Sequence, residues 1–223
     1  MNYLTQEEHS FFRNCLSTIY RFPGNVEQLS GTLFEDIFAE MKNGVRQNGG
    51  SSNAVDVIDS NGIKYSLKTA SLDTSLDLEK ILGIKDMLIP MTTLTKDKIL
   101  STEDIKNIIV PYYNNLNNLI DKQGFLIRLT SNPKESHSEF RFLYWEHPFE
   151  SINNDIEVIL NENSKKCHGF KSDINLISIP KKITWNSASQ RLRVYYKIPK
   201  NADIIIINKS EKFDWKSLVE KLK

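Results

Sequence analysis

The chain has few of the residues on which small secreted proteins and metal-cluster proteins depend. Its 223 residues include only two cysteines, Cys15 and Cys167, so we expect no disulfide framework. The histidines are scattered, and the one beside Cys167 has no companion cluster for a zinc site. No apolar run approaches a membrane span, and the first residues lack the basic and apolar regions of a signal peptide. We therefore expect a cytoplasmic protein in a reducing compartment, without contact to a membrane.

Familiar catalytic motifs are absent as well. The sequence has no glycine-rich phosphate loop, no Gly-x-Ser-x-Gly nucleophile elbow and no set of kinase motifs. A content of 39% hydrophobic and 26% charged residues is typical of a soluble globular protein rather than a disordered one. The net charge of +1 neither supports nor excludes binding to nucleic acid. A chain of this length can bury one good core, so we expect a single domain over residues 1–223.

The most informative segment that is present reads as a β-hairpin over residues 54–69. Residues 54–58 and 63–69 are rich in β-branched and aromatic side chains, which favour strands. The four residues between them, Asp59-Ser60-Asn61-Gly62, are typical of a turn that needs a positive φ angle. The pattern therefore predicts two antiparallel strands joined by a short connection.

The length of that connection decides which side chains meet. Side chains alternate between the two faces of a strand, so a connection of five residues places Asp56 opposite Ser66 and diagonally near Lys68. A two-residue turn at Asn61-Gly62 would instead place Asp56 opposite Leu67. The first register brings an acid and a lysine to one face, and we take it as the working hypothesis.

Asp56, followed ten positions later by Ser66-Leu67-Lys68, resembles the catalytic core of the PD-(D/E)XK nuclease superfamily, to which most restriction endonucleases belong. The resemblance covers about residues 28–82 and implies a mixed β-sheet flanked by helices, in a fold of the mixed α/β or α+β class. It implies that Asp56 binds Mg²⁺ and that Lys68 orients or activates water. Ser66 stands where the family usually has a second acid, and Val55 stands where it often has proline.

The serine leaves the predicted metal site one charge short, because a neutral hydroxyl supplies no charge to a hard cation. Some restriction enzymes of the family carry Ser-x-Lys and recruit a carboxylate from the helix after the second strand. Residues 71–80 are expected to form that helix here, and Asp77 and Glu79 are its candidate metal ligands.

A second source of charge lies upstream. Apolar residues recur at helical spacing over Gly31–Met41, which predicts a helix. Its Glu35 resembles the helix glutamate that completes the active site in several branches of the family, including mismatch-repair nicking enzymes. The resemblance therefore implies catalytic roles for Asp56, Ser66, Lys68 and Glu35.

Candidate DNA contacts fall in two regions. Residues 181–200 carry six basic residues and no acid, and they include a polar loop, 186–190, between apolar strands. Arg191 and Arg193 would share a strand face where they contact phosphates or guanine, and amide side chains can read adenine. The candidates in this region are Lys182, Asn186, Gln190, Arg191 and Arg193. An exposed basic hairpin without a partner is the plainer alternative.

The other region is the loop 42–53 before the hairpin, which contains no acid. Its Lys42, Arg46 and Gln47 could reach the DNA backbone beside the scissile phosphate, as could Lys64 on the hairpin. A plain connecting loop explains the same residues equally well.

The rest of the chain predicts further elements. Helices are expected over 6–20, over 95–120 as two pieces interrupted near Pro111, and over 212–222. Strands are expected over 125–130, 139–145, 156–160, 174–179, 192–198 and 203–208. Helices and a hairpin precede a run of strands, which favours a catalytic core of about 28–130 and a β-rich DNA-binding elaboration of about 131–223.

Together these features predict a Mg²⁺-dependent, sequence-specific endonuclease for double-stranded DNA. The resemblance implies a prokaryotic type II restriction enzyme that acts as a homodimer on a short palindrome. Two other interpretations remain: a repair or phage nuclease with the same core, and a noncatalytic DNA-binding protein with a decayed core. The plainest alternative is an ordinary hairpin on which Asp56 and Lys68 merely face solvent.

Overall fold

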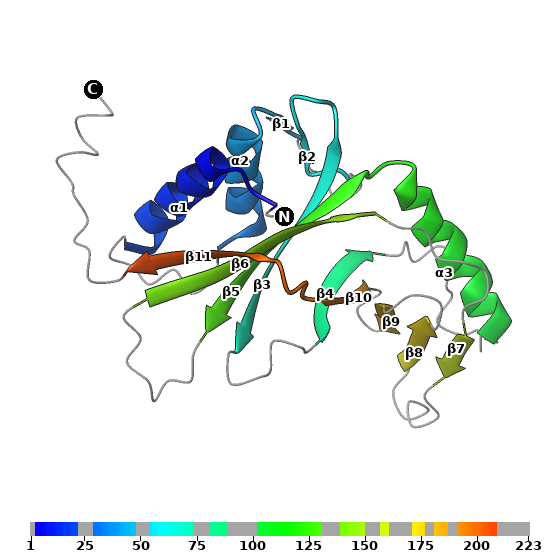
Figure 1. The fold of residues 1–223 in the computed structure, drawn as a ribbon. Helices are drawn as coiled ribbons and strands as arrows, with labels where there is room; N and C mark the ends of the chain where they lie inside the picture. The colour runs from blue at the N-terminus through cyan, green and yellow to red at the C-terminus, as the bar shows by residue number, and fades with distance from the viewer. Residues whose placement is uncertain are drawn as a thin grey trace.

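The computed structural model describes ten segments of the chain, which form three helices and two sheets (Figure 1). The segments are 3–21, 29–47, 54–73, 81–88, 102–130, 139–149, 157–160, 171–176, 181–186 and 191–208. The helices are α1 (Gln6–Arg21), α2 (Gly31–Met41) and α3 (Thr102–Asn117). The first four strands are β1 (Val45–Arg46), β2 (Val57–Ile58), β3 (Lys64–Asp73) and β4 (Ile81–Leu88). The others are β5 (Lys122–Thr130), β6 (Glu139–Pro148), β7 (Glu157–Leu160), β8 (Lys171–Leu176), β9 (Lys181–Asn186), β10 (Arg191–Lys197) and β11 (Asp203–Asn208).

The larger sheet is a mixed one with the strand order β1-β2-β3-β5-β6-β11. Strands β3 and β5 run parallel, and the other neighbours are antiparallel. Helices α1 and α2 cover one face of this sheet. Helix α3 lies beyond the end of the sheet at which β5 begins (Figure 1). The protein is therefore of the mixed α/β class, with a six-strand mixed sheet flanked by helices, as the coarse prediction had it.

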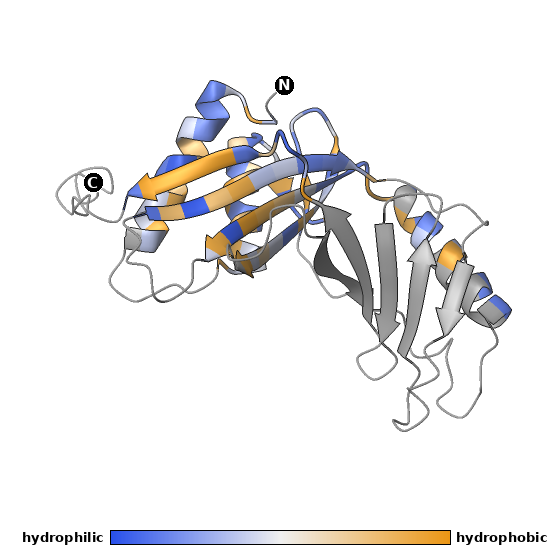
Figure 2. Ribbon diagram, turned by 60° about the horizontal axis from the view of Figure 1, so that its bottom comes forward, coloured by the Kyte–Doolittle hydropathy of each residue, from blue (hydrophilic) through white to orange (hydrophobic). Residues whose placement is uncertain are grey.

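The main core lies between this sheet and the first two helices. Phe12 of α1 packs edge-on against Tyr144 at 5.7 Å between ring centroids, and Phe38 of α2 packs against Tyr65 at 4.9 Å. On the opposite face of the sheet, Phe125 stacks on Trp145 at 4.8 Å. Phe142, Tyr144 and Trp145 of β6 are therefore buried in the core, and Figure 2 shows hydrophobic residues gathered on the strands of this sheet.

Both N-terminal helices form where their sequences predict. In α1, Thr5 and Glu8 make a reciprocal capping box, in which Thr5 N donates to Glu8 Oε2 at 2.8 Å and Glu8 N donates to Thr5 Oγ1 at 3.2 Å. In α2, Ser30 caps the first turn by accepting from Leu33 N at 3.2 Å. The capped start of α2 fixes the position of Glu35 one turn into the helix.

The N-terminal segment also closes the far edge of the six-strand sheet. Asp203, at the start of β11, accepts hydrogen bonds from Tyr3 N at 2.9 Å and from Leu4 N at 2.8 Å. Arg13 Nε donates to the carbonyl of Ile206 at 3.1 Å. An edge strand otherwise presents open carbonyls to other chains, and α1 occupies part of this row.

The smaller sheet is antiparallel throughout, with the order β4-β10-β9-β8-β7. Two predictions fail around it. Residues 71–73 continue strand β3 instead of starting a helix, because β3 stays paired with β5 as far as Asp73 and Thr130. Strand β4 then follows, which the sequence did not predict. Asp77 and Glu79 lie outside the described residues.

Pro111 does not divide helix α3. The helix runs from Thr102 to Asn117 with Pro111 inside it, so the predicted break is wrong. A proline inside a helix removes one backbone hydrogen bond and bends the helix, but the turns on either side can continue it. The predicted helix over 212–222 and the first part of the predicted stretch, 95–101, lie outside the described residues.

Strands from both sides of residue 130 contribute to each sheet. Strands β6 and β11 complete the larger sheet, and β4 is an edge of the smaller one. The division into a core of about 28–130 and an elaboration of about 131–223 stays a prediction. In the described part of the chain, no helix combines the length and the apolar character needed to cross a membrane.

Candidate active site

The turn between β2 and β3 fixes the register of the hairpin. Asp59 N donates to Ile63 O at 3.0 Å, and Asp59 Oδ1 accepts from the amides of Asn61 and Ile63. Gly62 adopts a φ of 80°, which glycine reaches without strain. Ile58 consequently lies opposite Lys64. The five-residue connection is confirmed, and the two-residue alternative is wrong.

Asp56 is held by backbone on both sides and by its own carboxylate. Its N–H donates to Tyr65 O at 2.8 Å, and its carbonyl accepts from Gln47 N at 2.8 Å. Its Oδ2 accepts from Leu67 N at 2.6 Å, where a carbonyl of a longer β2 would otherwise lie. The carboxylate of Asp56 thus has a fixed place beside β3.

Lys68, Ser66 and Asp56 form a continuous hydrogen-bonded chain. Lys68 Nζ donates to Ser66 Oγ at 2.8 Å, and Ser66 Oγ donates to Asp56 Oδ2 at 3.3 Å. Lys68 Nζ lies 3.9 Å from Asp56 Oδ2. The side chains of Lys68 and Asp56 are 19% and 22% exposed to solvent, so both are accessible, whereas Ser66 is buried.

Glu35 comes to this cluster from α2. Burial raises the pKa of its carboxyl, and the negative charge of Asp56 raises it further, while the charges of Arg46 and Lys68 lower it. Glu35 therefore lies within electrostatic reach of both Asp56 and Lys68. Asp56, Ser66 and Lys68 are thus hydrogen-bonded neighbours on the hairpin, and Glu35 on α2 interacts with Asp56 and Lys68 through its charge.

Arg46 makes an ion pair that the sequence did not predict. Its Nε lies 3.6 Å from Glu35 Oε2, and its Nη1 donates to Asp36 Oδ1 at 2.6 Å. The neighbouring Gln47 turns back onto its own strand, where its Nε2 donates to Val45 O at 3.3 Å. A tight turn, in which Asn43 adopts a φ of 48° and Gly44 N donates to Ala39 O at 2.8 Å, brings β1 back beside α2.

The candidate DNA contacts of the basic stretch belong to the smaller sheet. Lys182 and Asn186 lie in β9, and Arg191 and Arg193 lie in β10. Asn186, predicted as the start of the polar loop, instead ends β9 and is paired with Arg191, while residues 187–189 lie outside the described residues. Gln190 lies outside the described residues. Lys64, in contrast, lies on β3 two residues before Ser66 and alternates onto the same face.

Among the described residues, Asp56 and Glu35 are the predicted metal ligands at the hairpin; Asp56 Oδ2 accepts from Leu67 N and Ser66 Oγ, and Glu35 Oε2 faces Arg46. Within the described segments, no group of three or more His, Cys, Asp or Glu side chains is arranged to hold a metal. Mg²⁺ keeps several waters and is commonly bound through one or two carboxylates. Carboxylate oxygens are the kind of donor that Mg²⁺ takes, whereas the nitrogen and sulfur donors of a typical transition-metal cage are not gathered there among the described residues.

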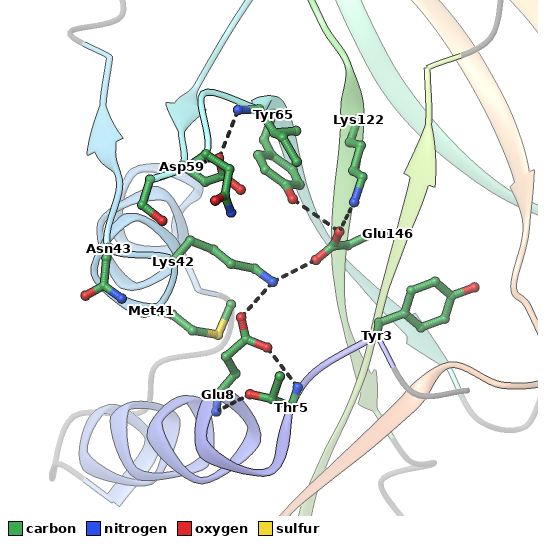
Figure 3. Close-up of a pocket in the computed structure, with 13 residues that line it drawn as sticks. Tyr3, Thr5, Glu8, Met41, Lys42, Asn43, Asp59, Tyr65, Lys122 and Glu146 are labelled. Atoms are coloured by element: carbon green, nitrogen blue, oxygen red, sulfur yellow. Dashed lines mark hydrogen bonds and ion pairs between the residues drawn. The ribbon is translucent and has the colours of Figure 1, made fainter.

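A polar pocket of about 400 Å³ lies on the other side of β3, since Tyr65 and Ser66 alternate across the strand (Figure 3). Lys42 Nζ lies at 2.8 Å from Glu8 Oε1 and at 3.1 Å from Glu146 Oε1. Lys122 Nζ lies at 3.1 Å from Glu146 Oε2. These charges neutralise one another and join α1, α2 and β6. Lys42 is thus engaged in this network, on the face away from Lys68.

Comparisons of the chain with protein-family models, with curated proteins and with solved structures found no match. The interpretation of the site therefore rests on its geometry and chemistry.

Proposed function

We propose that the protein is a Mg²⁺-dependent endonuclease that cuts double-stranded DNA at a specific sequence. The observation that supports this most is the chain Lys68, Ser66, Asp56 on one face of the hairpin, with Glu35 in electrostatic reach. If Asp56 and Lys68 merely faced solvent on an ordinary hairpin, an acid such as Glu35 of α2 would not be expected within electrostatic reach of both. The mixed sheet flanked by helices, with α2 preceding the hairpin, agrees with the fold that the PD-(D/E)XK resemblance implies.

Hydrolysis of a phosphodiester builds negative charge on the phosphoryl oxygens and on the leaving oxygen. Bound Mg²⁺ supplies charge stabilisation there and lowers the pKa of a coordinated water. Glu35 and Asp56 are the residues that would hold the ion. Glu35 would then supply the charge that Ser66 lacks, and Asp77 and Glu79 stay further candidates for the same role.

Lys68 supplies the positive charge that the reaction needs beside the attacking water or a nonbridging oxygen. Its ammonium is held by Ser66 at 2.8 Å and is kept near Asp56. Ser66 acts in this scheme as a positioning residue, because its hydroxyl accepts from Lys68 and donates to Asp56. A hydroxyl can do both, whereas an ionised carboxylate only accepts.

The remaining features follow from the resemblance to type II restriction enzymes. Two identical active sites in a homodimer are the simplest way to cut both strands of a two-fold symmetric sequence. The basic strands β9 and β10 would contact the DNA away from the scissile bond, and Arg46, Gln47 and Lys64 would contact it close by. A location in the cytoplasm of a prokaryotic cell belongs to the same proposal.

The test is cleavage of plasmid and of defined duplexes, with and without Mg²⁺, by the purified protein and two near-isosteric variants. We expect discrete fragments that need the metal and that disappear in both Asp56→Asn and Lys68→Met. The controls are Glu139→Gln and Arg141→Gln, which remove the charges of an exposed ion pair on β6. A thermal unfolding curve for each variant would check that the substitution leaves the protein folded.

Two other results would redirect the proposal. Binding of DNA without cleavage in every divalent metal tested would contradict an enzyme and favour the noncatalytic alternative. Cleavage confined to nicked, mismatched or branched duplexes would favour a repair or phage nuclease with the same site.

A further inference from the structure

We propose that Arg46 exchanges between the carboxylates of α2 and a DNA phosphate, so that metal binding at Glu35 releases Arg46 to the DNA. This inference rests on the proposed function and adds a coupling between metal and DNA at the same site. It assigns Arg46 two successive partners, whereas the sequence alone indicated only a phosphate contact.

The backbone places Arg46 beside the acids whatever its side chain does. Arg46 pairs with Val57 in the sheet, one residue from Asp56, and the following amide of Gln47 donates to the carbonyl of Asp56 at 2.8 Å. From this position the guanidinium reaches Asp36 at 2.6 Å and Glu35 at 3.6 Å. A positive group thus stands against one of the two carboxylates that the metal needs.

The contact is weak enough to be exchanged. The side chain of Arg46 is 32% exposed and that of Asp36 is 52% exposed, and ion pairs of this kind contribute little to stability. A divalent cation at Glu35 repels the guanidinium, which lies 3.6 Å from Glu35 Oε2, and so weakens its hydrogen bond to the neighbouring Asp36. The planar fork of arginine also matches the geometry of a phosphate, and DNA brings phosphates close to the catalytic face.

The alternative is that Arg46 only forms a structural ion pair, and this role predicts different results. If Arg46 only ties β1 to α2, then Arg46→Ala changes stability slightly and leaves the binding of metal and DNA unchanged. The two interpretations therefore separate in binding experiments that do not require turnover.

The first experiment titrates the protein with Mn²⁺ in the absence of DNA and measures binding by calorimetry. We expect Arg46→Ala to bind Mn²⁺ about two- to fivefold more tightly than the unmodified protein, the scale of one exposed ion pair. Arg141→Ala, which removes an exposed arginine paired with Glu139 on β6, should leave the affinity unchanged. Equal affinities of Arg46→Ala and the unmodified protein would overturn the exchange.

The second experiment measures binding of a mixed-sequence duplex by fluorescence anisotropy, without metal and with Ca²⁺. We expect Arg46→Ala to match the unmodified protein without metal and to bind more weakly with Ca²⁺. The salt dependence of binding with Ca²⁺ should become shallower by about one phosphate contact. An equal loss of affinity with and without metal would show that Arg46 contacts phosphate permanently, which contradicts the exchange.

The same measurements distinguish a failure of the proposed metal site from a failure of the Arg46 exchange alone. If the unmodified protein binds no Mn²⁺, or if Glu35→Gln and Asp56→Asn leave Mn²⁺ binding unchanged, the metal site itself is refuted, and the exchange with it. If those two variants lose Mn²⁺ while Arg46→Ala has no effect, only the exchange is refuted.

Discussion

At the scale of single residues, Ser66 has an unusual position for a hydroxyl. It is almost fully buried, and it lies between an ammonium and a carboxylate that keep about a fifth of their exposure. The hydroxyl lies between Lys68 and Asp56 and bonds to both. The direct distance from Lys68 Nζ to Asp56 Oδ2 is 3.9 Å, which is longer than a hydrogen bond. The orientation of Lys68 therefore depends on a neutral neighbour.

Ser66→Ala tests this dependence. Without the hydroxyl, Lys68 loses the acceptor of its hydrogen bond, and we expect the cleavage rate at saturating DNA to fall by about tenfold to a hundredfold, the scale of misplacing a catalytic group. The free energy of unfolding should fall by about 2 kcal/mol, because a charged donor loses one of its hydrogen bonds. Ser71→Ala, on the exposed part of the same strand, serves as the control. An unchanged rate at saturating DNA would refute the positioning role of Ser66.

The sequence predicted Asp56, Ser66 and Lys68 as neighbours because alternation along strands and the length of one turn determine that distance. It also indicated Glu35, through the resemblance. The ion pair of Arg46 with Asp36 was not predictable in this way. It depends on how closely α2 approaches β1, and that approach is set by packing of Phe34 and Phe38 in the core.

At the scale of helices and strands, the charged network around Lys42 fixes α1 and α2 to the sheet. Burial of Glu8 would raise its pKa, but the hydrogen bond and charge of Lys42 together with the hydrogen bonds from Thr5 outweigh burial and lower it. The hydrogen bonds and charges of Glu8 and Glu146 likewise raise the pKa of Lys42 against the effect of burial. The ion pair of Glu8 and Lys42 is therefore charged at neutral pH.

We expect Lys42→Met to lower the free energy of unfolding at pH 7 by about 3 kcal/mol, the scale of removing one partner of a buried ion pair. Since the folded-state pKa of Glu8 is lowered, its stabilising contribution is present above its unfolded value of 4.5 and is lost as the pH falls below it. The difference between the variant and the unmodified protein should therefore shrink in acid. Urea unfolding between pH 3 and 7 measures this, with Arg141→Met as the control, and a difference independent of pH would contradict it.

At the scale of the whole molecule, local patterns predicted most strands but not their partners. Residues 203–208 were predicted as a strand and form one, yet nothing local indicates that β11 pairs with β6 at the edge of the larger sheet. Strand β4 was missed, and β3 was predicted too short. In both cases the strand is defined by partners far along the chain, β10 for β4 and β5 for β3. Register within a hairpin is local information, whereas the order of strands in a sheet is not.

The homodimer is a prediction at this scale. We expect light scattering coupled to gel filtration to give twice the chain mass of 25.8 kDa. Supercoiled plasmid with one recognition site should be linearised with little accumulation of nicked circles, because two active sites act on one bound duplex. A monomer that releases nicked circles would contradict the restriction-enzyme form of the proposal while leaving the catalytic site intact.

The hydrogen bonds of Asp203 to the amides of Tyr3 and Leu4 have a consequence for biosynthesis. The partners are separated by about 200 positions, so the start of α1 is fixed in place only after β11 has been synthesised. The six-strand sheet can be completed only after residue 208 has left the ribosome. A nascent chain would therefore expose the open edge of β6 until β11 has been made, long after the residues of the candidate site have left the ribosome.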